Sequence, residues 1–173
     1  MRSANQRRNI MRLGIDIGRV LIAPDGDGGA DTSFIGGTLA AALATPPYAG
    51  MFETVPELVR LFGGAVWLVS KCGPSVQEKT RHWLDHHDFY GRTGMPRDHV
   101  RFCLQRPQKA DHCRELRLTH FIDDRPDVLR HLAGLVPHRY LFGPQRDAAI
   151  DAGVTPCPDW PTALARVRRD LHV

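Results

Sequence analysis

Five short apolar runs alternate with segments of helical pattern, and this alternation is the feature that most limits the possible folds. Each run is bounded by Gly, Pro or charged residues, as buried strands are. The runs lie at 13–17, 65–70, 99–103, 119–122 and 138–142. Parallel strands need crossover connections, which are right-handed, so the alternation predicts an α/β fold with a parallel five-stranded sheet covered by helices on both faces.

Helix start signals support the same arrangement. Thr54-Val55-Pro56-Glu57 and Ser75-Val76-Gln77-Glu78 both have the form of a capping box, and Asp159 is placed to cap a helix that runs to about residue 170. Shorter helices are expected at 109–116 and 126–132. No internal repeat or second domain is indicated.

Two segments depart from the alternation. Residues 1–11 are polar and basic without periodicity, which predicts a disordered arm before a single domain at 12–173. Residues 23–50 are too long and too Gly-rich for an ordinary connection, so we expect them to form a flap over a binding site, without a large cap domain.

Composition excludes several classes of protein. No stretch approaches the roughly 20 apolar residues of a membrane span, and the N-terminus lacks the apolar core of a secretion signal, so a cytoplasmic location is expected. Four cysteines show no CxxC pair, which favours reduced thiols. The net charge is +4, but the basic residues are scattered, so nucleic-acid binding has little support and a small molecule is the expected partner.

The ends of the predicted strands carry the chemistry. Asp16 ends the first strand, Ser70 ends the second, and the pair Asp123-Asp124 ends the fourth, while Lys109 starts the helix after the third. The carboxyl ends of parallel strands meet at one edge of the sheet, where ligands bind in open α/β folds. We therefore expect these side chains to form one site.

The residue types of this site favour a metal ion and a phosphate. Grouped carboxylates repel one another unless a cation lies among them, and oxygen ligands without His or Cys favour Mg²⁺. Asp16 can then act as a nucleophile toward phosphorus, while Lys109 offsets charge and Ser70 donates a hydrogen bond to the phosphoryl oxygens. The sequence predicts phosphoryl transfer.

Each residue also has a purely structural interpretation. Asp16 could cap a turn, Ser70 could satisfy a turn backbone, and Asp124 could cap the next helix. The chain has 20 Arg and 3 Lys, so a lysine at such a position is unusual for it. Lys71, next to Ser70, competes with Lys109 for the same role.

Four segments resemble the motifs of the haloacid dehalogenase (HAD) superfamily, in the same order. They are Asp16 to Leu21, Trp67 to Ser70, Lys109, and Phe121 to Pro126. Ile122 to Pro126 is most similar to the 5′(3′)-deoxyribonucleotidase branch. The resemblance implies a Rossmann-like sheet of order 5-4-1-2-3, Asp16 as nucleophile through an aspartyl-phosphate, and Mg²⁺ held by Asp16, the Gly18 carbonyl and a carboxylate of Asp123 or Asp124. It also implies a phosphomonoester substrate, which we expect to contact Arg19, Ser70, Lys71, Lys109 and Arg125.

One departure from the family pattern stands at Gly18. HAD phosphatases carry there a second Asp, which serves as general acid and then base, typically worth about 10²–10⁴ in rate. Arg19 does not replace it, because its pKa stays above about 12. The alternatives are therefore a phosphatase with impaired or relocated acid catalysis, a hydrolase of carbon–halogen or carbon–phosphorus bonds, and a non-catalytic phospho-ligand binder. The flap or a second subunit of a homodimer would exclude water.

Overall fold

The fold is a single twisted parallel sheet with helices on both faces. The structure, a computed structural model, describes residues 10–24, 34, 37–145 and 150–173. All strand pairs are parallel, and the sheet order is β3-β2-β1-β4-β5-β6. The strands are β1 (Leu13–Ile15), β2 (Val66–Lys71), β3 (Val100–Cys103), β4 (His120–Asp123), β5 (His138–Phe142) and β6 (Val154–Cys157).

The sheet confirms the α/β prediction with one correction, because it has six strands rather than five. The sixth strand, β6, pairs with β5 at the edge of the sheet. It is short and contains Pro156, which removes a backbone donor and makes a strand hard to recognise from its pattern. An edge strand tolerates proline because one of its sides carries no ladder partner.

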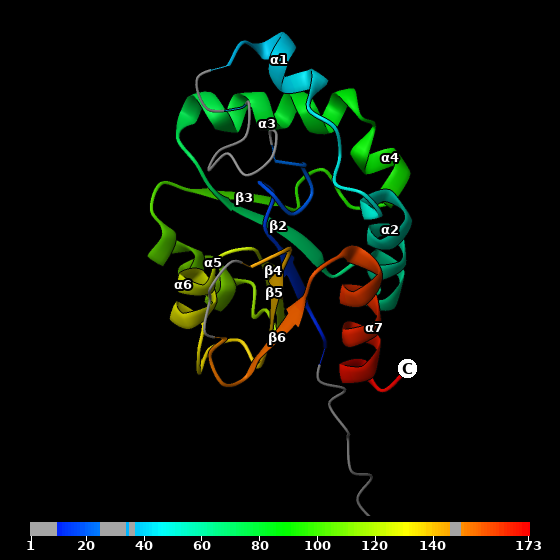
Figure 1. Cartoon of the computed structure of the whole chain (residues 1–173), viewed down its shortest axis with the longest axis vertical. Helices are drawn as coiled ribbons and strands as arrows, with labels where there is room; N and C mark the ends of the chain where they lie inside the picture. The colour runs from blue at the N-terminus through cyan, green and yellow to red at the C-terminus, as the bar shows by residue number, and fades with distance from the viewer. Residues whose placement is uncertain (1–9, 25–33, 35–36, 146–149) are drawn as a thin grey trace, which may run out of the picture.

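The helices form two layers, one on each face of the sheet. Figure 1 shows α5 and α6 on one side and α2 and α7 on the other, with α1 lying over α3. The helices are α1 (Leu39–Ala44), α2 (Met51–Leu61), α3 (Pro74–His86), α4 (Phe89–Thr93), the 3₁₀ turn η1 (Arg106–Gln108), α5 (Lys109–Glu115), α6 (Pro126–His131) and α7 (Trp160–Leu171).

Each face of the sheet has its own hydrophobic core, because successive strand residues point to opposite faces. Leu13 and Ile15 pack in the core beneath α2 and α7, whereas Phe121 packs in the core beneath α5 and α6. Gly14 points to the second core, where an added Cβ would lie 2.5 Å from Phe121 Cδ2 and 2.6 Å from Leu118 Cδ1. The missing side chain lets Phe121 lie across β1.

Two predicted helix starts are wrong by a few residues. Helix α2 begins at Met51 rather than at a Thr54 cap, because the fully buried Met51 and Val55 lie on the apolar face that packs on the sheet. Helix α3 begins at Pro74, a residue favoured at the first helical position, so Ser75 lies inside its first turn. Asp159 caps α7 as expected, accepting a 2.8 Å hydrogen bond from the Thr162 amide.

Parts of the two unusual segments lie outside the described residues. This applies to 1–9 of the predicted arm and to 25–33 and 35–36 of the predicted flap. The described part of the flap contains helix α1, which was not predicted. Thr45, the residue that follows α1, is tied to α3, because the Trp83 indole donates a 2.8 Å hydrogen bond to the Thr45 carbonyl. In the described ranges, no helix is both long and apolar enough to cross a membrane.

Candidate active site

The residues predicted from the strand ends meet at one edge of the sheet. Register places Ile15 of β1 opposite Leu68 of β2 and Ile122 of β4. The Asp16 amide donates a 2.9 Å hydrogen bond to the Ile122 carbonyl, which holds Asp16 level with Asp123. Pairing of three central strands therefore brings together residues that are more than 100 positions apart.

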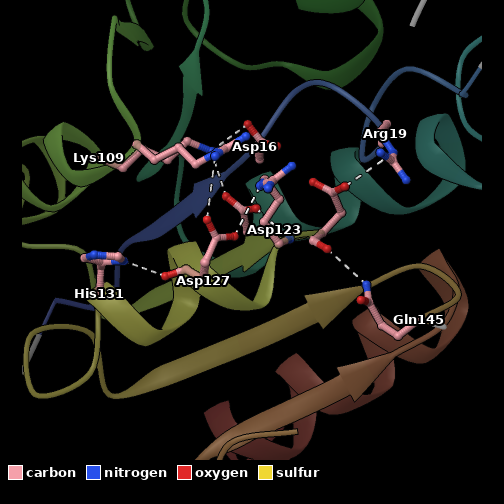
Figure 2. A network of polar contacts seen from close by, with 10 residues as sticks. Asp16, Arg19, Lys109, Asp123, Asp127, His131 and Gln145 are labelled. Carbon is pink, nitrogen blue, oxygen red and sulfur yellow. Dashed lines mark hydrogen bonds and ion pairs between the residues drawn. The ribbon is translucent and has the colours of Figure 1, made fainter. Parts of the chain in front are cut away.

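Lys109 joins the two strand ends. Its ammonium group donates hydrogen bonds to Asp16 Oδ1 at 2.8 Å and to Asp123 Oδ2 at 2.7 Å, and Figure 2 shows it pointing between the two carboxylates. Only 2% of Lys109 is exposed, although it is the first residue of α5. Lys71 is exposed at the end of β2, so the structure places Lys109, and not Lys71, between the carboxylates.

The members of the aspartate pair after β4 have different surroundings. Asp123 is fully buried, and its other oxygen, Oδ1, accepts a 2.9 Å hydrogen bond from the Arg125 amide. Asp124 lines the cavity described below, and its Oδ2 lies 3.5 Å from Arg19 Nε. Gln145 holds the Asp124 backbone by donating to its carbonyl at 3.0 Å. Both oxygens of Asp123 thus bind protein donors, whereas the Asp124 carboxylate, paired with Arg19, lines the cavity.

Burial and charge act against each other in this cluster. Burial raises the pKa of Asp123 and of Asp124, and the charge of Asp16 raises both further. Burial by itself would lower the pKa of Lys109, but the charges of Asp123 and Asp16 outweigh it and hold that pKa above its usual value. Two cations, Lys109 beside Asp16 and Asp123 and Arg19 beside Asp124, face three acidic side chains, which leaves negative charge that a further cation could offset.

The three aspartates have the geometry of a metal site. Asp16, Asp123 and Asp124 each offer a carboxylate oxygen, and the three oxygens lie within 4.8 Å of one another. An all-oxygen donor set with substantial negative charge suits Mg²⁺, which takes one or two carboxylates and keeps room for water and phosphate oxygens. The residues present therefore fit a hard divalent cation.

A cavity opens beside this cluster and collects the other predicted residues. Gly18, Arg19, Ser70, Lys71 and Arg125 all line it, together with Asp16, Lys109 and Asp124. Apolar side chains also line the cavity. They are Ile17 and Ile22 after β1, Phe34, Val76 of α3 and Val128 of α6. The cavity has the mixed lining of a small-ligand site.

Sequence reasoning missed two candidates, one that lines the cavity and one that anchors a lining residue. Arg106 of η1 lines the cavity, and Gln145 anchors Asp124 from the loop after β5. Arg106 was not recognised from the sequence because the chain has 20 arginines and Arg106 does not end a predicted strand. Its spacing of three residues before Lys109, across a 3₁₀ turn, is the signal that could have found it.

No described residue fills the space beside Gly18, the position where the sequence departs from the HAD pattern. A Cβ built on Gly18 meets no heavy atom within 4 Å. Among the described cavity-lining residues, the carboxyl side chains are those of Asp16 and Asp124, and no His is present. A side chain at position 18 would therefore point into unfilled volume next to Asp16.

Comparison with known proteins establishes the fold. No family model matches the sequence, and no curated protein matches it significantly. Among solved structures, the chain matches a haloacid dehalogenase-like family hydrolase from Xanthomonas campestris, with a TM-score of 0.58 and 17% identity over 92% of this chain and 95% of that one. The chain therefore has a HAD-like fold, in agreement with the order in which its four motifs occur.

Proposed function

We propose that this protein is a Mg²⁺-dependent phosphohydrolase of the HAD type that acts on a phosphomonoester. The observation that carries the proposal is the contact of one buried ammonium group, Lys109, with Asp16 and Asp123 at the edge of a HAD-like sheet. The strand-end position of Asp16 beside a cavity makes it the candidate nucleophile. Nucleoside monophosphates are the first substrate class to test.

In the proposed mechanism, an Asp16 oxygen attacks the phosphorus atom and the bond to the leaving alkoxide breaks, which leaves an aspartyl-phosphate. The alkoxide takes a proton from solvent and leaves as an alcohol. Water then attacks this phosphorus and gives a proton back to solvent, which releases inorganic phosphate and regenerates the Asp16 carboxylate. Lys109 orients Asp16 and offsets charge on the transferring oxygens, and Ser70 donates a hydrogen bond to one of them.

Asp16, Asp124 and the Gly18 carbonyl are the proposed ligands of Mg²⁺. Bound there, the ion would supply charge neutralisation for the phosphoryl oxygens. Asp123 contributes indirectly, because both of its oxygens already bind protein donors, Lys109 and the Arg125 amide. This arrangement favours Asp124 over Asp123 as the direct ligand of the pair.

The test is Mg²⁺-dependent release of phosphate from a panel of phosphomonoesters. Asp16→Asn is expected to lower turnover at least 10³-fold, because the amide is a poor nucleophile. The control is Asp151→Asn, which alters an exposed ion pair with Arg130 away from the cavity. No release above the Asp16→Asn background from any ester would overturn the proposal.

Gly18 favours a second candidate function, a phospho-ligand binder without turnover. This alternative predicts Mg²⁺-dependent binding of a nucleotide in calorimetry, with no phosphate released over hours. Turnover at about one per second, within the usual enzymatic range, would exclude it. Cleavage of carbon–halogen or carbon–phosphorus bonds is a third option that the same substrate panel can include.

A further inference from the structure

The cavity has a basic rim that takes no part in the bond breaking of the proposed hydrolysis. Lys71, Arg106 and Arg125 line it from three different segments: the end of β2, the turn η1, and the turn after β4. These segments follow strands of the same parallel sheet, so the three cations meet at the edge that also carries Asp16. We refer to these three residues as the basic rim.

Asp127 holds two members of the basic rim in place. Arg125 Nε lies 3.2 Å from Asp127 Oδ1, and Arg106 Nη1 lies 3.8 Å from Asp127 Oδ2. Asp127 itself is not among the residues that line the cavity. Its carboxylate therefore contacts both guanidinium groups without itself lining the cavity.

The charges of the rim are incompletely balanced. Lys109 and Arg19 are paired with the acidic cluster, Lys109 with Asp16 and Asp123, and Arg19 with Asp124. The Lys71 ammonium group makes no hydrogen bond or ion pair with the described residues, and the described carboxylate paired with the other two rim cations, Arg106 and Arg125, is that of Asp127. With Asp127 included, the rim carries a net charge of +2, while the acidic cluster with Mg²⁺ and a phosphate dianion keeps one unbalanced negative charge. One positive charge therefore remains to attract a second anionic group.

We propose that the substrate is a phosphomonoester with a second anionic group, a carboxylate or a second phosphate, bound by Arg106 together with Arg125 and Lys71. This inference rests on the proposed function. Ile22, Phe34 and Val76, which also line the cavity, are apolar and offer an anion no partner, so among the described lining residues the rim is where a second anionic group finds free positive charge. A guanidinium presents paired donors that match carboxylate and phosphate oxygens, which assigns the main contact to the arginines.

The experiment compares matched esters that differ in the second anionic group. One pair is phosphoglycolate and the analogue in which its carboxylate is replaced by an uncharged amide. The other pair is a nucleoside 3′,5′-bisphosphate and the corresponding 5′-monophosphate. The wild-type protein is expected to have a kcat/KM at least tenfold higher for the doubly anionic member of one pair, and which pair responds separates carboxylate from phosphate. Arg106→Gln should reduce that preference roughly tenfold to hundredfold, as the loss of a charge-assisted contact does.

Arg114→Gln is the matched control, because Arg114 belongs to the neighbouring helix α5, is exposed and pairs with Asp111 outside the cavity. It should leave the preference unchanged. Circular dichroism of both variants checks that they fold. Turnover of both members of each pair with equal kcat/KM overturns the inference and leaves the hydrolase proposal standing.

A binding measurement separates the two proposals. Calorimetry of Asp16→Asn with Mg²⁺ measures affinity for the same four compounds without hydrolysis. A doubly anionic compound is expected to bind more tightly than its partner, and adding Arg106→Gln should remove the difference. This result supports binding of the second anionic group by the basic rim even if the wild-type protein hydrolyses no ester. Equal affinity within each pair, or no binding of any compound, overturns it.

Discussion

Lys109 and Asp123 form a fully desolvated ion pair, with 2.7 Å between Lys109 Nζ and Asp123 Oδ2 and at most 3% of either side chain exposed. The pair bridges the start of α5 and the end of β4. Because the same ammonium group also binds Asp16, its removal would leave two buried carboxylates without their common partner. This contact therefore links the stability of the sheet edge to the chemistry proposed for it.

Lys109→Met is expected to lower the free energy of unfolding by about 3–5 kcal/mol, because removing one partner of a buried ion pair leaves the other charge buried and unpaired. Urea unfolding measures this change. Arg114→Met removes an exposed pair with Asp111 and should cost less than about 1 kcal/mol. Equal losses in the two variants would contradict the central role of Lys109.

Mg²⁺ is expected to stabilise the folded protein, because it binds a site that the unfolded chain lacks. At about 100 times its Kd the gain is about 2.7 kcal/mol, seen as a rise in Tm. Asp124→Asn should weaken Mg²⁺ binding at least tenfold, because it removes a charged ligand; a tenfold change corresponds to about 1.4 kcal/mol of binding free energy. Asp151→Asn should keep the full Tm shift; the same shift in both variants would argue against Asp124 as a ligand.

Gly18→Asp is expected to raise phosphatase activity, by up to about 10², if the missing acid limits the rate. The open space around a Cβ at this position indicates that the side chain fits. Gly18→Asn is the control, since it has the same shape and no transferable carboxyl proton. A steady-state rate for Gly18→Asp no higher than that for Gly18→Asn would show that acid catalysis is not what limits turnover.

The fully buried His120 makes stability depend on pH. It stacks on His138, with ring centroids 4.4 Å apart, and burial together with the nearby His138 lowers the pKa of His120 to about 3. The unfolded chain takes up the proton near pH 6.5, so the stabilisation is complete above that pH and is lost progressively as the pH falls toward 3.

His120→Phe should remove this dependence. Between pH 6.5 and pH 5 the wild-type protein is expected to lose about 2 kcal/mol relative to His120→Phe, at about 1.4 kcal/mol per pH unit. Urea unfolding at both pH values, without metal, gives the difference. His82→Gln, on the exposed face of α3, should follow the wild-type protein, and parallel pH profiles for all three proteins would refute the assignment.

The fold class followed from the sequence because strand and helix patterns depend on local periodicity. The runs at 65–70 and 138–142 have enough apolar residues to mark buried strands, and β2 and β5 are found there. The edge strand β6 lacks such a run, since one side of an edge strand meets solvent and its sequence is less constrained. Helix α1 is similarly short, and a six-residue helix depends on its packing over α3 more than on its own pattern.

The sequence by itself determined which residues could form the site, because the carboxyl ends of parallel strands must meet: Asp16, Ser70 and Asp123-Asp124 are chosen by strand position alone. Only the tertiary structure decided how they are used. It placed Lys109 between two carboxylates, enclosed Asp123 and left Asp124 facing the cavity, and brought Arg106 to the rim. Burial and charge pairing arise from segments far apart in the chain, so no local pattern encodes them.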